Sequence, residues 1–260
     1  MKFALPFLSL VIILSSCRSY RYFSLEGENI RIDSSFRFAM ENDCLRLEYD
    51  FSGDNGPVSV TVFNKLTVPL YVNWRRSALV TGVEAQSYYA PDIQWSGSTE
   101  SRSIDWGGGT VSASGTIQGI GRMQEGIDFI PPQSKKTRSF LTLATSSLKE
   151  INFEGAPKRP LEGRLDQPSV RHIDFDLASS PLKFRSYISF STQEDGSGGF
   201  SLDHRFYVSG AYKSLLGPDA VVPIQGRGDR FYTSRSTGVG TGVALVAGAA
   251  LIVVASGRGD

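Results

Sequence analysis

The regular alternation of apolar and polar side chains on either side of a tight turn most constrains how this chain can fold. Apolar residues take every second position around the turn sequence Gly-Asp-Asn-Gly at 53–56: Leu45, Leu47, Tyr49 and Phe51 before it, then Val58, Val60 and Val62. A period of two places such a set on one face of a β-strand, and Asn and Gly adopt the positive φ angles of a hairpin turn at little cost. Two paired strands with one buried face are therefore predicted over 45–51 and 57–64.

Further alternating segments predict that the rest of the body is also built from short strands. They lie at 70–74, 139–143, 172–177, 184–192 and 200–208. Residues 107–121 are instead rich in Gly, Ser and Thr, which indicates a long loop or an edge hairpin. Short strands separated by closely spaced turn signals are typical of a sandwich or a barrel. We predict a mainly β fold, an Ig-like antiparallel β-sandwich over residues 26–232, with Trp74 and the alternating valines of 58–62 facing its core.

The N-terminus has the organisation of an export signal that ends in a cysteine. Lys2 precedes an apolar stretch at 3–13, and the sequence Leu-Ser-Ser-Cys follows and ends at Cys17. A secretory signal has the same order of charge, apolar run and small residues, and the last four residues resemble the lipobox of bacterial lipoproteins. We therefore predict that residues 1–16 are removed, that Cys17 becomes a lipidated N-terminus, and that residues 17–25 form a tether. The alternatives are a secretory signal with a chance cysteine, and an uncleaved membrane helix, for which about 20 apolar residues are needed.

The C-terminal segment, residues 233–260, departs from the strand pattern. Residues 239–255 are uncharged and dominated by Val, Ala, Leu, Ile and Gly, and Gly240, Ala244 and Gly248 recur every fourth position. A run of this length is at the lower limit for a membrane span, and small residues four apart let helices approach closely in lipid. We predict a membrane helix whose small-residue face packs on a partner or a second copy. The alternative is a core strand or a helix packed on the body.

Charge and cysteine content exclude several classes of function. The 27 basic and 26 acidic residues leave a net charge of +1 and form no basic stripe, so nucleic acid is not an expected partner. The chain has two cysteines, and lipidation of Cys17 would leave Cys44 without an internal disulfide partner. We interpret Cys44 as a small apolar residue, and no cofactor is indicated.

One strand carries the residues that come nearest to a chemical site. His172, Asp174 and Asp176 alternate with apolar residues, so all three are expected on one strand face. Imidazole and carboxylates together can bind a divalent metal, but any strand with one solvated face shows the same alternation. We predict a solvated face here, with no metal site and no catalytic residue.

Four aromatic residues near the Gly/Ser-rich stretch at 107–121 form a second candidate. They are Tyr88, Tyr89, Trp95 and Trp106. Together with that stretch they could form a contact surface for a ligand or partner. The alternative is that they fill the core of the sandwich, where aromatic residues are common.

Several segments together carry a resemblance at the level of a family. They are 41–43 (Glu-Asn-Asp), 45–49 (Leu-Arg-Leu-Glu-Tyr), 64–66 (Asn-Lys-Leu), 69–72 (Pro-Leu-Tyr-Val) with Trp74 and Ser77, and 129–132 (Phe-Ile-Pro-Pro) with Ser134. With the lipobox and the uncharged C-terminal run, these segments resemble a family of uncharacterised lipoproteins from Bacteroidota-type bacteria. The resemblance implies an envelope location and a β fold but no chemistry.

These features indicate a cell-envelope lipoprotein that acts as a non-enzymatic binding or scaffolding module at a membrane. Membrane lipid is the expected partner of Cys17 and of the C-terminal segment, and a protein partner or self-association would use the helix. The outer membrane is the default location, and the inner membrane is expected if the C-terminal helix spans. The alternatives are a hydrolase that acts on envelope glycans through unassigned carboxylates, and a subunit of a larger membrane complex.

Overall fold

Antiparallel β-strands make up most of the computed structural model, which describes residues 18–89, 95–104, 110–119, 126–161, 168–221 and 226–236. Two sheets form the body, and a separate pair of strands forms a third sheet. The helical elements α2 (Ser146–Lys149) and the 3-10 turn η2 (Pro218–Ala220) are single turns. The prediction of a mainly β, antiparallel fold is therefore confirmed.

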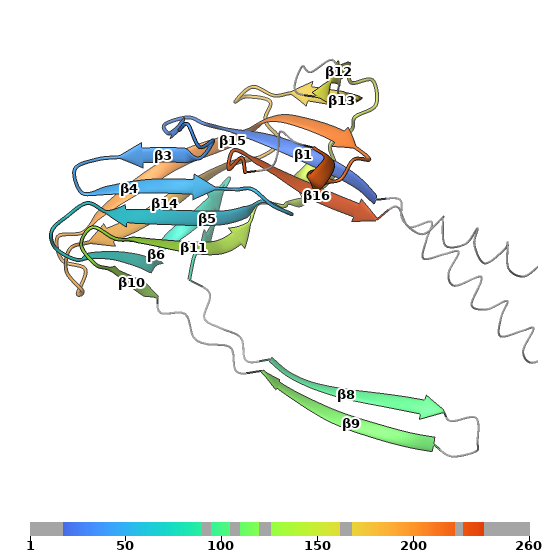
Figure 1. Ribbon diagram of the computed structural model, residues 1–260, viewed down its shortest axis with the longest axis horizontal. Coiled ribbons are helices and arrows are strands. Elements are labelled where there is room, and N and C mark those ends of the chain that lie inside the picture. Colours follow the sequence, from blue (N-terminus) through green and yellow to red (C-terminus); the bar gives the residue numbers. More distant parts are fainter. Residues whose placement is uncertain are drawn as a thin grey trace, which may run out of the picture.

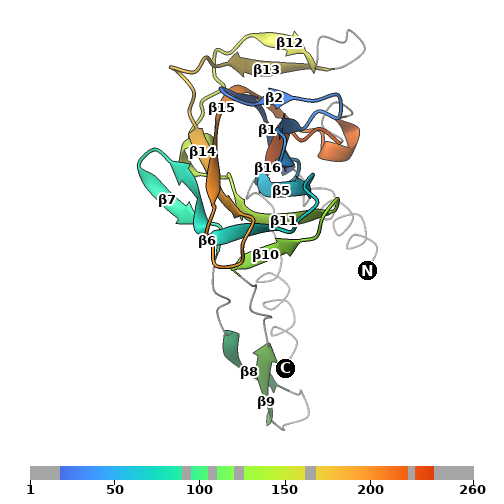
Figure 2. The same ribbon diagram turned by 90° about the vertical axis from the view of Figure 1, so that its left-hand side faces the viewer.

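The larger sheet has nine strands and branches at its longest member, β15 (Phe200–Ser214). Its main path runs β10 (Ile127–Ile130), β6 (Leu70–Thr81), β14 (Lys183–Ser191), β15, β1 (Arg18–Gly27), β16 (Arg230–Ser236). Strand β7 (Glu84–Ser87) pairs with β6, and the hairpin of β12 (Lys158–Pro160) and β13 (Ser169–Asp174) joins the second half of β15. Figure 2 shows this hairpin at one end of the body.

The smaller sheet has five strands and faces the larger one across the core (Figure 1). Its order is β11 (Lys135–Thr142), β5 (Pro57–Asn64), β4 (Leu45–Asp50), β3 (Phe38–Glu41), β2 (Arg31–Ile32). The third sheet is a hairpin of β8 (Trp95–Ile104) and β9 (Thr110–Gly119). The second of these strands covers most of the Gly/Ser-rich stretch, in agreement with the edge-hairpin alternative rather than the loop.

The core between the two sheets contains the apolar residues that the alternating sequence pattern predicts to be buried. Strands β4 and β5 alternate buried and half-buried along their whole length, and Val58, Val60 and Val62 are 0 to 1 % exposed. Trp74 is 2 % exposed. The predicted inward faces of these strands and the burial of Trp74 are therefore confirmed.

The N-terminal segment corrects the prediction of a tether. Residues 18–27 form β1, which pairs with β15 on one side and β16 on the other. Phe23 and Leu25 enter the main core, whereas Tyr22 is buried in a second cluster on the opposite face of the sheet. Because both faces of β1 are covered, its apolar residues do not alternate, and the strand pattern is lost from the sequence. The described body therefore begins at Arg18 and ends at Ser236.

The turn between β4 and β5 depends on a glycine for two separate reasons. Asn55 and Gly56 have φ angles of +62° and +63°, and a Cβ on Gly56 would lie 2.9 Å from the ring of Phe231. Gly82, between β6 and β7, has a similar φ of +61° but no atom within 4 Å of such a Cβ. Substitutions at Gly82 and Gly56 therefore distinguish the cost of backbone strain alone from the cost of strain combined with crowding.

We expect Gly82→Ala to lower the free energy of unfolding by about 1 kcal/mol, since only the positive φ is strained. Gly56→Ala should cost about 1–3 kcal/mol more, because the added methyl group also pushes against a buried ring. Urea denaturation of both variants measures the difference. Equal losses would show that the Phe231 ring moves aside freely.

Candidate functional site

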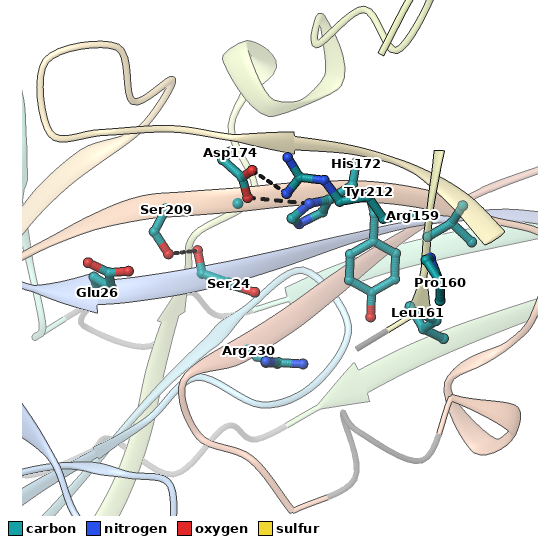
Figure 3. A pocket seen from close by; sticks show the side chains of 12 residues that line it. Ser24, Glu26, Arg159, Pro160, Leu161, His172, Asp174, Ser209, Tyr212 and Arg230 are labelled. Carbon is teal, nitrogen blue, oxygen red and sulfur yellow. Dashed lines mark hydrogen bonds and ion pairs between the residues drawn. The ribbon is translucent and has the colours of Figure 1, made fainter. Parts of the chain in front are cut away.

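A pocket of about 530 Å³ lies on the outer face of the larger sheet (Figure 3). Its walls come from β1, β12, β13, β15 and β16, and therefore from segments far apart in the sequence. The outer face carries Tyr22 and Tyr212, whose strand neighbours Phe23 and Ala211 face the main core. The pocket thus opens away from the sandwich interior.

A β-bulge in β15 shapes one wall of the pocket. Ser24 pairs with Gly210 and Leu25 pairs with Val208, so Ser209 is an extra residue on β15. The Ser209 hydroxyl lies 3.5 Å from the carbonyl oxygen of Ser24. Bulges re-aim side chains and are frequent beside binding sites, and here the bulge turns both serines toward the pocket.

The rim of the pocket holds a small ionic cluster on β12 and β13. Arg159 Nη1 donates to Asp174 Oδ2 at 2.6 Å, and His172 Nδ1 lies 3.3 Å from Asp174 Oδ1. Burial lowers the pKa of His172, an effect that Asp174 opposes and Arg159 supports. The imidazole is therefore neutral near pH 7, and Asp174 is shared between the two side chains.

The inner end of the pocket is formed by Tyr212 and Arg230. Tyr212 is 5 % exposed, and its hydroxyl is buried with no hydrogen-bond partner among the described residues. The side chain of Arg230 is 13 % exposed, and burial lowers its pKa to about 10. In Figure 3 the hydroxyl end of Tyr212 points to the side of the pocket where Arg230 lies. This end of the pocket therefore combines a buried cation with a hydroxyl available to a ligand.

Stacked tyrosines hold this wall in place. The Tyr22 and Tyr212 rings stack at 4.9 Å, and Tyr20 and Tyr232 pack around Tyr22 at 6.1 and 6.0 Å. The Tyr22 hydroxyl donates to the carbonyl oxygen of Leu216 at 2.6 Å. Tyr212 cannot rotate away without breaking this packing, so its hydroxyl position is well defined.

The structure divides the three residues of the predicted solvated face. His172 and Asp174 line the pocket, whereas Asp176 caps a turn by accepting hydrogen bonds from the backbone and hydroxyl of Ser179. Asp174 is exposed, and the side chain of His172 is 25 % exposed. Within the described ranges, no group of three or more His, Cys, Asp or Glu side chains is placed to hold a metal ion.

Of the four aromatic residues of the predicted contact surface, the structure describes the side chains of Tyr88 and Tyr89. Tyr88 is 3 % exposed, packs on Trp74 and donates its hydroxyl to Ser186 at 2.8 Å, so it belongs to the core. Tyr89 is half-buried with Arg75 over its ring at 4.9 Å. Trp95 begins β8, and Trp106 lies outside the described residues.

The predicted anchors lie outside the described residues. These are Cys17 and residues 237–260 with Gly240, Ala244 and Gly248, whereas residues 233–236 of the predicted C-terminal segment belong to β16. In the part of the chain that is described, no helix is both long and apolar enough to cross a membrane. Cys44 is a free, half-buried thiol.

Sequence reasoning missed Tyr212, Arg230 and Arg159 as site residues. Tyr212 and Arg230 lie in sequence typical of ordinary strands, and Arg159 lies in a Pro-rich stretch. No motif in the neighbouring sequence distinguishes any of the three. Only the strand order of the larger sheet brings them together. Comparisons with family models, with curated proteins and with solved structures find no match to this chain.

Proposed function

We propose that this protein is a lipid-anchored, Ig-like β-sandwich module of a bacterial cell envelope, which binds a ligand or partner at a membrane. One observation supports the anchoring above all others. In the register of β1 and β16, Arg18 is directly opposite Ser236. Directly opposite residues of an antiparallel pair have Cα atoms about 4.5–5.5 Å apart. The chain therefore enters and leaves the described body at one point of one sheet end (Figure 1).

This register gives the two predicted anchors a common direction. Cys17 directly precedes β1, and the uncharged segment directly follows β16. A lipid on Cys17 and a C-terminal membrane helix would then enter the same bilayer side by side. Because β1 begins one residue after Cys17, the body would be held against the membrane surface rather than on a flexible tether.

The side chains at this end suit a position beside lipid headgroups. Arg18, Arg235 and Lys213 lie on the last residue pairs of the sheet, and the nearby Leu215 is 75 % exposed. Basic residues close to an anionic bilayer each contribute about 1 kcal/mol of attraction. The adjacent Tyr20 is of a residue type that is enriched at membrane interfaces, and the exposed leucine can insert its apolar side chain below the headgroups.

Binding is favoured over hydrolysis because both pocket carboxylates already have fixed partners. Asp174 is held by Arg159 and His172. Glu26 accepts a hydrogen bond of 2.5 Å from Tyr207, which raises the pKa of that tyrosine to about 12. Both carboxylates thus have partners that compete with a role as general acid or base.

Removing the anchors one at a time tests the proposal. We expect Cys17→Ser, expressed behind a cleavable secretory signal, and a truncation after Ser236 each to leave the protein in the membrane fraction, and the double variant to become soluble. Cys44→Ser is the matched control for the cysteine and should keep the mass of a lipidated protein that lacks residues 1–16. Release by Cys17→Ser alone would contradict the C-terminal anchor, and retention of the double variant would contradict both.

A further inference from the structure

We propose that four basic side chains, which form one row across the larger sheet, bind the anionic headgroups of a lipid bilayer and orient the body on the membrane. This basic row consists of Lys158, Arg171, Lys213 and Arg21, on β12, β13, β15 and β1. The proposal rests on the membrane location proposed above and deepens it, because it names the face of the body that meets the lipid and the charge of that lipid.

The register of the strands places the four residues side by side. Lys158 is directly opposite Arg171, which is directly opposite Lys213. Lys213 is in turn directly opposite Arg21. Such residues point to the same face of a sheet with Cβ atoms about 4.5–5.5 Å apart, and a strand spacing of about 4.8 Å gives the row a length of roughly 14 Å. Because its members are far apart in the sequence, no basic run is visible there.

A row of like charges is unfavourable for folding unless opposite charge neutralises it. Like charges directly opposite each other on a sheet are destabilising, and this spacing is shorter than the screening length of about 8 Å at physiological ionic strength. Burial and, as the smaller effect, the charge of Arg235 on β16 lower the pKa of Arg21. A further cation therefore adds to the repulsion at this end of the row.

Within the described part of the chain, the row contacts carbonyl oxygens rather than carboxylates. Arg21 Nη1 donates to the carbonyl oxygens of Leu148 and Lys149 at 2.9 and 2.6 Å, and Arg171 Nη1 donates to that of Phe153 at 2.9 Å. None of the four residues forms an ion pair with a described acid. A partner of negative charge would supply what these contacts do not.

Another pair of like charges in the same sheet is compensated inside the protein. Arg185 on β14 is directly opposite Arg205 on β15, and Arg185 Nη1 lies 2.7 Å from a carboxylate oxygen of Asp203. Glu150 and Glu154, beside the carbonyl groups that the row contacts, are exposed and make no ion pair with it among the described residues. The basic row therefore differs from an ordinary charged strand face in leaving its charge to an external partner.

The position of the row favours a bilayer over a soluble polyanion. Lys213 is the last residue but one of β15, and Arg21 is three residues from Arg18, where the chain enters the body. A rise of about 3.3 Å per residue gives roughly 10 Å. Lys158, Arg171 and Lys213 are exposed, and Arg21 is half-buried. A membrane that holds both ends of the chain is thus within reach of the row, and basic clusters beside an anchor attract anionic lipid.

Lysine labelling of the full-length protein in vesicles tests the proposal. The vesicles contain phosphatidylcholine alone or with phosphatidylglycerol, and a membrane-impermeant amine reagent is read out by mass spectrometry. We expect Lys149, Lys158 and Lys213 to react about fivefold more slowly in the anionic vesicles, because headgroups cover them. The exposed Lys135 and Lys183 should react equally in both. Salt at about 1 M, where the screening length is about 3 Å, should remove the protection.

Two outcomes of the labelling would overturn the proposal. The first is equal reaction of the row lysines in the two kinds of vesicle. The second is protection by soluble inositol hexakisphosphate in phosphatidylcholine vesicles without protection by phosphatidylglycerol, which would assign the row to a soluble polyanion. Co-flotation with phosphatidylcholine vesicles reports the anchors alone, so failure of the anchoring proposal and failure of the row are distinguishable.

Removing the exposed charges of the row tests its role directly. The row variant combines Lys158→Gln, Arg171→Gln and Lys213→Gln. The control variant removes the same charge from exposed positions elsewhere, with Arg31→Gln, Lys135→Gln and Lys183→Gln. We expect the row variant to lose the protection of Lys149 in anionic vesicles and the control variant to keep it. Protection that persists in the row variant would contradict the proposal.

The melting temperature of the row variant in neutral detergent micelles tests the argument from repulsion. It should equal or exceed that of the wild type, with the largest gain at low ionic strength, because like charges are removed and screening is weakest there. A lower melting temperature than in the control variant would show that the row stabilises the fold, and would overturn the inference that its charge is left for a membrane.

Discussion

Replacing Asp128 with asparagine is expected to lower the free energy of unfolding by about 3 kcal/mol at pH 7, which is the lower end of the cost of breaking a buried ion pair. Asp128 is 1 % exposed and lies on β10, at the edge of the larger sheet. Its carboxylate accepts hydrogen bonds from Trp74 Nε1 at 2.8 Å and from Arg138, and it pairs with Lys136 at 2.7 Å. Because both cations are on β11 of the smaller sheet, Asp128 connects the edges of the two sheets.

The lower end of the range applies because the network is partly solvated. The side chains of Arg138 and Lys136 are 17 % and 42 % exposed, so water screens part of the lost attraction. Urea denaturation measures the loss. Asp174→Asn is the matched control, because Asp174 is 58 % exposed in its pair with Arg159, and exposed pairs contribute about 0–1 kcal/mol. Similar losses in the two variants would contradict the role assigned to burial.

The same carboxylate should make stability depend on acidity. Burial raises the pKa of Asp128, but the hydrogen bonds from Arg138, Lys136 and Trp74 outweigh this effect and hold the pKa below its usual value. A folded pKa below the unfolded value of about 3.9 means that the contribution is complete above that pH and is lost as the pH falls through the folded pKa. The stability difference between wild type and Asp128→Asn should therefore shrink below about pH 4.

Phe206→Ala should cost about 3–5 kcal/mol, the range for truncating a fully buried aromatic side chain. Phe206 is 0 % exposed and projects from β15 of the larger sheet. Its ring contacts Phe38 and Tyr49 of the smaller sheet at centroid distances of 5.1 and 5.2 Å, and Phe184 of its own sheet at 5.1 Å. Truncation would open a cavity between the two layers, where the surrounding rings cannot collapse fully.

Thermal and urea unfolding of Phe206→Ala check this expectation. Phe129→Ala is the control, because Phe129 is 49 % exposed and loses little burial when it is truncated. A loss below 1 kcal/mol at Phe206 would show that the aromatic cluster is not the shared core of the two sheets.

The sequence alone predicted the elements in which one strand face is buried and the other is solvated. Strands β4 and β5 and the burial of Trp74 follow from a period of two, which is a local property of the chain. On the predicted solvated face of β13, Asp174 is exposed, but His172 is half-buried and lines the pocket. Where both faces of a strand are covered, as at Tyr22 and Phe23, the alternation disappears and the strand was missed.

Tertiary structure determined the features that do not follow the local alternation of apolar and polar residues. In β10 the alternation alone would point Phe129 inward and Asp128 outward, but the structure exposes the phenylalanine and buries the acid. That reversal depends on the cations Lys136 and Arg138 of β11, which lies in the other sheet. Likewise, Tyr212, Arg230 and Arg159 meet only because β15, β16 and β12 lie around one pocket. The sequence by itself therefore determined the strands and their inner faces, whereas strand order and register, which are set by long-range pairing, determined the ionic network, the pocket and the common exit of both chain ends.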